Sequence, residues 1–247
     1  MNRAVVLVVA LVAILSAALY VRMHGADSDS TTDAADAPET ADDGNGSTDP
    51  GAIADYAAAL DDSNPFAQMQ GATMAQAATN DNVGAGLATI QTAEGTIDAD
   101  DPYAVCYAYK HTVQDKSRHP AQWYTDATGA RVREWGGEPL DSLGPTYAGL
   151  VSTAAGAYQI KLATWLACTK ALALTDFSNA SQDRAAIYLI QGRGGLDALK
   201  AGQFDAFIAA CAPEWASLPG ANYAGQGMRS IQALRDEFAQ DGGVIAA

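Results

Sequence analysis

The pattern of apolar and polar positions begins with an unbroken apolar run over residues 4–21, bracketed by Arg3 and Arg22. A soluble core helix would show a polar face, and this run has none. Its length reaches the lower end of the roughly 17–25 residues that cross a bilayer as a helix. A secretory signal peptide is the competing interpretation, with Ser16-Ala17-Ala18 as a cleavage site of small residues. We favour a transmembrane anchor over residues 1–23, because apolar residues continue past that site.

Residues 24–80 are acidic and contain few large apolar side chains. The first half, residues 24–51, holds no aromatic residue and is rich in Asp, Ser, Thr, Ala, Gly and Pro. Such a composition buries too little apolar surface to offset chain entropy, so we expect a largely disordered tether. Residues 52–80 are rich in alanine and partly helical in pattern, but Asn64-Pro65 interrupts them.

From about residue 82 the pattern becomes that of a folded domain, which we place at residues 81–247. A helix is predicted over residues 84–93, ending at Glu94-Gly95. Residues 121–147 gather turn formers and alternating aromatic residues, which predicts a small hairpin lobe. Further helices are predicted over residues 154–174, 179–191, 203–211 and 228–240. Helices with one small β-lobe indicate an α+β fold.

The charge distribution limits the partners. The net charge is -15, and residues 23–109 contain no lysine or arginine. Nucleic-acid binding needs a basic surface, so we expect no nucleic-acid partner. Cys106, Cys168 and Cys211 lack metal-ligand spacing. Buried small apolar residues are their simplest interpretation, with one disulfide as the alternative. No metal and no cofactor is expected.

Glu94 is the first candidate for chemistry. A carboxylate at the end of an apolar helix faces the negative end of the helix dipole, and partial burial would add to that effect. Both raise its pKa, which favours a carboxylic acid that stays protonated near neutral pH. A glycosidic bond needs such a proton donor on its leaving oxygen. The alternative is a solvated glutamate at a frayed helix end.

Several motifs around Glu94 and after it resemble the lambdoid phage endolysins, which are lysozyme-fold peptidoglycan lytic transglycosylases. The motifs are Ala93-Glu94-Gly95-Thr96, Pro102-Tyr103, His119-Pro120, Ser152-Thr153-Ala154-Ala155-Gly156-Ala157-Tyr158-Gln159, Leu174-Thr175-Asp176-Phe177-Ser178, Ser181-Gln182-Asp183, Arg193-Gly194 with Leu196, and Trp215-Ala216-Ser217-Leu218-Pro219-Gly220. They follow the family's order, and the resemblance runs from about residue 88 to the C-terminus. Residues 121–147 look longer or different, and residues 1–80 lie outside the resemblance.

The resemblance implies a lysozyme-like fold and a mechanism with one carboxyl group. Glu94 would protonate the leaving oxygen of the MurNAc–GlcNAc bond, then take a proton from the muramic acid 6-hydroxyl as that oxygen closes onto C1. The product is a 1,6-anhydro sugar. The implied substrate-binding residues are Tyr103, Ser152, Thr153, Tyr158, Gln159, Tyr223 and Gln226.

Structural roles compete for most of these residues. Ser152 and Thr153 are first of all predicted helix caps. Tyr103 and Tyr223 suit core packing as well as stacking on a sugar. Trp215 is expected in the core, and Gly156 at a close backbone approach.

Two other functions stay open at this point. A lysozyme-type hydrolase would need a second carboxylate, for which Asp98, Asp100 and Asp101 are the candidates. A wall-binding virion protein without activity is the other. For the enzyme we expect peptidoglycan strands as substrate and the lipid bilayer as partner through residues 4–21. The catalytic domain would then face the wall from the host inner membrane or from an internal virion membrane.

Overall fold

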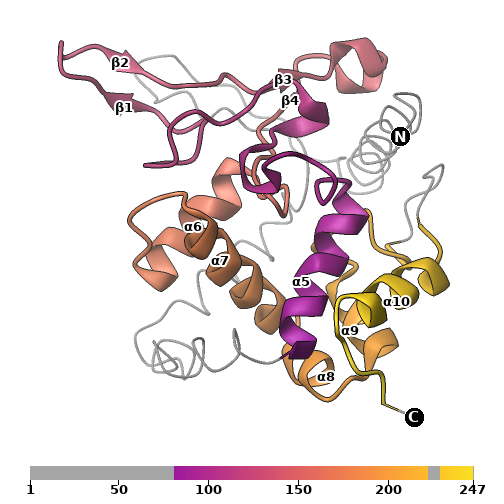
Figure 1. Cartoon of the computed structure of the whole chain (residues 1–247). Coiled ribbons are helices and arrows are strands. Elements are labelled where there is room, and N and C mark those ends of the chain that lie inside the picture. The colour runs from indigo at the N-terminus through magenta and orange to yellow at the C-terminus, as the bar shows by residue number, and fades with distance from the viewer. Residues whose placement is uncertain (1–80, 222–228, 247) are drawn as a thin grey trace, which may run out of the picture.

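The computed structural model describes residues 81–221 and 229–246, within the predicted catalytic domain (Figure 1). The predicted anchor, the acidic linker, Tyr223 and Gln226 lie outside the described residues. Among the residues that the structure describes, every helix is too short or too polar to cross a bilayer. The bilayer contact through residues 4–21 therefore stays a prediction.

The described chain forms a helical body with a small lobe of short strands beside it (Figure 1). The α-helices are α5 (Asp81–Glu94), α6 (Leu162–Leu172), α7 (Asn179–Gly192), α8 (Leu196–Lys200), α9 (Phe204–Cys211) and α10 (Ile231–Gln240). Helix α5 runs through the body and contacts α7, α8 and α10. Large buried side chains from these helices fill the core between them: Ile90, Ile187, Leu199, Phe204, Phe207 and Phe238.

Local signals explain where most of these helices begin and end. The Ser178 hydroxyl accepts a hydrogen bond from the Ser181 N–H at the start of α7, and the Ser230 hydroxyl accepts one from the Ala233 N–H at the start of α10. Gly95 ends α5 with a φ of 74°. The helices predicted over residues 84–93, 179–191 and 203–211 are confirmed. The short helix α8 was not predicted.

The lobe consists of short strands in two antiparallel pairs. Strand β1 (Tyr124–Thr125) pairs with β2 (Arg131–Val132), and β3 (Glu138–Pro139) pairs with β4 (Val151–Ser152). Four 3-10 turns complete the described elements: η1 (Pro102–Ala104), η2 (Tyr107–Tyr109), η3 (Asp141–Leu143) and η4 (Pro145–Tyr147). The predicted hairpin is confirmed, and the lobe also includes β4, which lies beyond the predicted range.

The prediction of one helix over residues 154–174 is wrong in its first half. Helix α6 begins at Leu162, and the segment before it turns back so that Ala155 and Ile160 exchange backbone hydrogen bonds of 3.1 and 3.0 Å. Gly156 makes this turn with a φ of 79°. Ala155 also forms a β-bridge with Cys106. The alanine-rich composition suits a helix, but the backbone here is used for long-range pairing.

Ser152 and Thr153 accordingly do not cap a helix that starts beside them. Ser152 belongs to strand β4. The Thr153 hydroxyl accepts a hydrogen bond of 3.1 Å from the Leu162 N–H, so it caps α6 across the intervening turn. The prediction that Ser152 caps a helix is therefore wrong. Thr153 does cap a helix, but that helix is α6, which begins at Leu162.

The three cysteines are free thiols buried in the protein. Burial raises the pKa of the Cys106 thiol to about 12, and it does the same for Cys211. Their interpretation as small apolar core residues is confirmed, and no disulfide joins them.

Candidate active site

Glu94 is the last residue of α5, and its carboxylate meets a residue from the far end of the chain. The Ser217 hydroxyl donates a hydrogen bond of 2.5 Å to Glu94 Oε1. Burial raises the pKa of Glu94 to about 7, while the Ser217 hydrogen bond and the positive charge of Lys161 act in the opposite direction. The side chain therefore exists in comparable protonated and ionised fractions near neutral pH, as a group that both gives and takes a proton requires.

Replacing Ser217 by alanine is expected to move the alkaline limit of activity to higher pH. The Ser217 hydroxyl stabilises the ionised carboxylate, so its loss raises the pKa of Glu94 further. The Glu94 carboxyl then stays protonated, and able to donate its proton, at higher pH. The parent should lose kcat/KM as the pH rises through about 7. Rate profiles from about pH 5 to 9 on purified sacculi, the substrate that the family resemblance implies, measure the shift.

The matched control is Ser142→Ala, at an exposed serine in η3. Its profile should overlie that of the parent. An alkaline limit that stays in place or moves downward in Ser217→Ala would show that the Glu94 proton does not control the rate.

The chain just after Glu94 is held by α5 itself and by segments further along the sequence. The Thr96 hydroxyl donates a hydrogen bond of 2.6 Å to the Ala157 carbonyl, and the Thr96 N–H donates one to the Gln91 carbonyl. The Tyr109 hydroxyl donates a hydrogen bond of 2.5 Å to the Gly95 carbonyl. These contacts set the position of the α5 terminus and therefore of the Glu94 side chain.

Tyr109 is a site feature that the sequence analysis missed. Its side chain is 44% exposed, although its hydroxyl contacts the residue next to Glu94. Ala108 and Tyr109 both have left-handed backbones, with φ of 52° and 59°. Such conformations are unfavourable for residues with a Cβ, and they gather at functional sites. No local signal marks them, because alanine and tyrosine are not typical left-handed residues.

Two of the three predicted tyrosines, Tyr103 and Tyr158, share the carboxylate of Asp183. The hydroxyls of Tyr158 and Tyr103 donate to Asp183 Oδ1 over 2.5 and 2.8 Å, and Tyr158 also accepts a bond from Gln91 of α5. Tyr158 is only 1% exposed, whereas Tyr103 is half-buried. Burial and the Asp183 charge raise the pKa of Tyr158 well above its ordinary value. This network supports the last turns of α5 from inside the protein.

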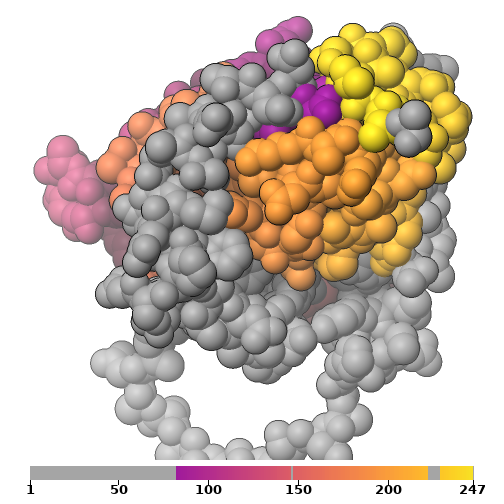
Figure 2. Space-filling model, turned by 90° about the horizontal axis from the view of Figure 1, so that it is seen from below, coloured from indigo at the N-terminus to yellow at the C-terminus, as the bar shows by residue number. Residues whose placement is uncertain are grey.

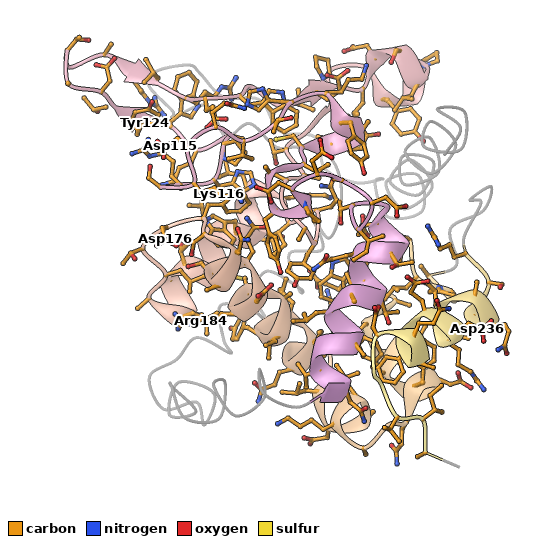
Figure 3. The ribbon with its side chains drawn as sticks, viewed as in Figure 1. Asp115, Lys116, Tyr124, Asp176, Arg184 and Asp236 are labelled. Carbon is orange, nitrogen blue, oxygen red and sulfur yellow. The ribbon has the colours of Figure 1, made fainter. Side chains whose placement is uncertain are left out.

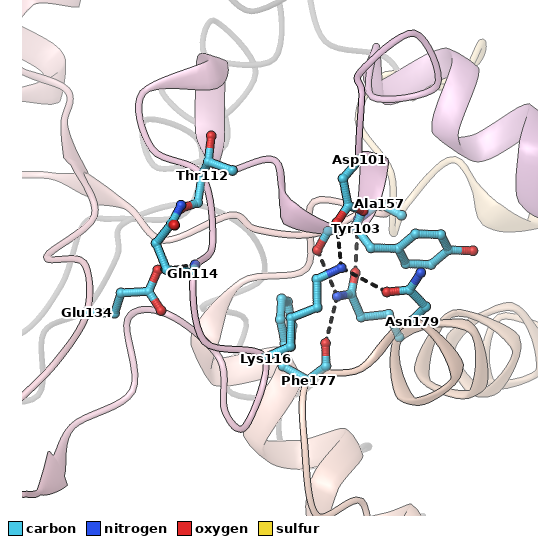
Figure 4. Close-up of polar contacts among 10 residues, drawn as sticks. Asp101, Tyr103, Thr112, Gln114, Lys116, Glu134, Ala157, Phe177 and Asn179 are labelled. Atoms are coloured by element: carbon cyan, nitrogen blue, oxygen red, sulfur yellow. Dashed lines mark hydrogen bonds and ion pairs between the residues drawn. The ribbon is translucent and has the colours of Figure 1, made fainter.

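Gln182 connects Tyr103, Ala157 and Phe177, which are labelled in Figure 4. Its amide nitrogen donates to the carbonyls of Tyr103 and Phe177, and its Oε1 accepts the Ala157 N–H. Beside it, Lys116 bridges Asp101 and Asn179 at 2.8 and 2.9 Å. Trp215 is buried as predicted, and its indole N–H donates to the Tyr158 carbonyl.

Gln159 is half-buried in the turn before α6. Its amide nitrogen donates to the carbonyls of Val105 and Gly156, and its backbone φ is 49°. These bonds hold the turn in place. Ser152 and Thr153 are both buried. Contact of these three residues with a glycan stays a prediction.

His119, from the His119-Pro120 motif, has a structural role inside the protein. Its Nδ1 accepts the Ala121 N–H, so Nε2 carries the proton that is donated to the Ile160 carbonyl over 3.1 Å. Burial lowers the pKa of this imidazole to about 4. The ring is therefore neutral at physiological pH and joins the lobe to the turn before α6.

The three aspartates that follow Glu94 lie in an exposed turn. The Asp101 carboxylate accepts the Tyr103 N–H at the start of η1 and pairs with Lys116, which is a structural role. Asp98 and Asp100 are exposed. None of the three aspartates therefore has the buried, fixed position beside Glu94 that the second carboxylate of a hydrolase would need.

A family model of the endolysins matches residues 84–245, which is more than half of the chain and includes Glu94 and Ser217. The chain belongs to the endolysin family. Its endolysin segment is 48% identical over 95 residues to the endolysin of Escherichia phage P2, covering 38% of this chain and 57% of that protein. It is 42% identical over 96 residues to the endolysin of Escherichia phage lambda, covering 39% of this chain and 60% of that protein. The chain thus spans less than two thirds of the length of either relative.

Solved structures of phage lambda lysozyme share the endolysin fold. The lysozyme complexed with a chitohexasaccharide superposes with a TM-score of 0.54 at 32% identity, over 68% of this chain and 97% of that one. A second structure of lambda lysozyme gives a TM-score of 0.51 at 28% identity, with the same coverage. The predicted lysozyme-like, mostly helical fold with small sheets is confirmed, and the resemblance to the lambdoid phage endolysins is confirmed as well.

Proposed function

We propose that this endolysin degrades peptidoglycan as a lytic transglycosylase that cuts the MurNAc–GlcNAc bond, with Glu94 as its acid and base. The observation that carries the proposal is the pKa of about 7 at a single carboxyl group that ends α5 and accepts a hydrogen bond from Ser217. Membership of the endolysin family supports the substrate class.

The reaction needs one proton to leave Glu94 and another to return. In the first step the protonated carboxyl transfers its proton to the glycosidic oxygen, and the bond between that oxygen and C1 of MurNAc breaks. In the second step the Glu94 carboxylate takes the proton of the MurNAc 6-hydroxyl while O6 bonds to C1. Glu94 ends protonated and no water is consumed. Between the steps, the Ser217 hydroxyl and the Lys161 charge stabilise the carboxylate.

The glycan is held, in this proposal, by groups around the α5 terminus. Exposed Tyr109 offers an aromatic face for a sugar ring, and half-buried Tyr103 offers a second. Tyr158 acts as a positioning residue through Gln91. Gln159, Ser152, Thr153, Tyr223 and Gln226 complete the set implied by the family resemblance. A lambda lysozyme structure that carries a chitohexasaccharide supports glycan binding on this fold.

Mass spectrometry of the fragments released from purified sacculi tests the reaction type. Ring closure should release muropeptides that end in 1,6-anhydro-MurNAc, each lighter by one water than the hydrolysis product of the same length. Reducing-end MurNAc as the main product would overturn transglycosylation and assign the chain a hydrolase mechanism with a second carboxylate. Sacculi that stay intact would instead favour a wall-binding protein without activity.

The predicted anchor gives this proposal a location. An apolar segment at residues 4–21, followed by an acidic tether, would hold the enzyme at a membrane with its folded domain on the wall side. The host inner membrane and an internal virion membrane are both consistent with that arrangement.

A further inference from the structure

The β1–β2 hairpin presents one tryptophan and two arginines on the same face. Tyr124 pairs with Val132 and Thr125 pairs with Arg131, so the antiparallel register places Trp123 opposite Arg133. The guanidinium carbons of Arg131 and Arg133 lie 5.0 and 4.6 Å from the centre of the Trp123 ring. We call these three residues, Trp123, Arg131 and Arg133, the arginine face.

The arginine face is accessible and held in place. The hairpin projects from the body in both views of the molecule, where it is drawn in pink (Figures 1 and 2). Trp123 is 44% exposed, Arg131 is exposed and Arg133 is half-buried. Asp126 fixes the hairpin loop, because its Oδ1 accepts hydrogen bonds from the N–H groups of Thr128 and Ala130.

The opposite side of the hairpin contacts the segment that precedes it in the chain. The Arg118 guanidinium stacks on the Tyr124 ring at 3.7 Å, and it pairs with Asp115 at 3.2 Å. Tyr124 and Asp115 lie close together at the base of the hairpin in Figure 3. This arginine is therefore neutralised within the protein, unlike the two of the arginine face.

Arg131 and Arg133 pair with no carboxylate among the residues that the structure describes. Their neighbour Glu134 is directed elsewhere: its carboxylate accepts a hydrogen bond from the Gln114 N–H (Figure 4). It also accepts one from the Asp115 N–H and pairs with His111 at 2.7 Å. The chain as a whole carries a net charge of -15. Two neighbouring arginines without a carboxylate partner, on a protein with this much negative charge, indicate that the arginine face binds an anion from outside the protein.

The chemistry of the face identifies the kind of anion. A guanidinium stacked on an aromatic ring keeps its N–H edge open, and that edge matches a carboxylate through two parallel hydrogen bonds. In intact peptidoglycan the lactyl groups of the glycan are amide-linked, so the free carboxylates belong to the stem peptides. We propose that the arginine face binds stem-peptide carboxylates of peptidoglycan and so favours strands that carry peptides. This inference rests on the proposed function.

The test compares two substrates and two matched variants of the full chain. One substrate is native sacculi, and the other is sacculi whose carboxylates have been converted to neutral amides with a carbodiimide and methylamine. The first variant is Arg131→Gln/Arg133→Gln. The control is Lys170→Gln/Arg184→Gln, which removes the same charge from exposed positions on α6 and α7. Figure 3 shows Arg184 on α7, away from the hairpin.

The arginine-face variant should lose roughly five- to tenfold in kcat/KM on native sacculi, through KM, because one or two charge-assisted hydrogen bonds at an exposed site are lost. On amidated sacculi it should equal the parent, which itself should be slower there than on native sacculi. The control variant should follow the parent on both substrates.

Four results would overturn the inference. The first is no loss of activity in the arginine-face variant on native sacculi. The second is an equal loss on both substrates, which would indicate a contact with the sugar chain, and the third is an equal loss in the control variant, which would indicate an effect of bulk charge. The fourth is a gain on both substrates, which would indicate that the chain's own acidic segment occupies the arginine face. A parent that cuts neither substrate would instead contradict the proposed function itself.

Discussion

Replacing Glu94 by glutamine is expected to lower the rate of peptidoglycan cleavage by roughly 10³-fold or more, because one positioned acid or base contributes about 10²–10⁴-fold. Here the same group serves both steps. The glutamine amide has nearly the shape of the carboxyl group and still accepts a hydrogen bond from Ser217. It carries no proton that can be transferred at neutral pH. Initial rates of turbidity loss with purified sacculi measure the effect.

The fold of Glu94→Gln should survive, and the variant should lack a pH-dependent destabilisation that the parent carries. The folded-state pKa of Glu94 is raised from 4.5 to about 7, so ionisation of this half-buried group destabilises the folded protein as the pH rises through that range. Glutamine removes this penalty, so above pH 7 the variant should melt at the same temperature as the parent or higher. Glu237→Gln, on helix α10, is the matched control and should keep full activity. A Glu94→Gln protein that clears sacculi at the parent rate would exclude Glu94 as the acid.

Replacing Gly156 by alanine is expected to destabilise the fold by roughly 2–5 kcal/mol, the sum of about 1–2 for a left-handed backbone and about 1–3 for overpacking. The residue has a φ of 79°, and a Cβ there would lie 2.1 Å from Gln182 Oε1. Gln182 has no room to move, because its amide bonds to the Ala157 N–H and to the carbonyls of Tyr103 and Phe177. Urea unfolding of parent and variant measures the loss.

Gly129→Ala separates the two contributions. Gly129 has a similar φ of 83°, but nothing lies within 4 Å of the position of its Cβ. This control should lose only the backbone part, about 1–2 kcal/mol. Equal losses at both positions would show that the contact with Gln182 contributes nothing. Activity should also fall in Gly156→Ala, since Ala157 accepts the Thr96 hydrogen bond beside the α5 terminus.

The elements that the sequence predicted correctly are those whose signals are local. Helix α5 follows from an apolar, alanine-containing segment that ends in Glu94-Gly95, and α7 follows from the Ser178 cap. The close approach at Gly156 was predicted as well, because glycine has no Cβ. The long helix predicted over residues 154–174 failed for the opposite reason. Its composition favours a helix, but pairing of Ala155 with Cys106 and Ile160 determines its backbone.

By itself, then, the sequence determined the fold class, the end of α5 and the identity of the candidate acid, because neighbouring residues and ordered motifs specify them. Only the tertiary structure decided what surrounds that acid. Ser217 reaches Glu94 from 123 positions away, and Tyr109 reaches Gly95 through two left-handed residues. The pKa of about 7 and the unneutralised arginine face depend on burial and on the absence of nearby partners among the described residues. The raised pKa and the lack of partners are properties of the folded chain, because local sequence does not specify which distant side chains come into contact.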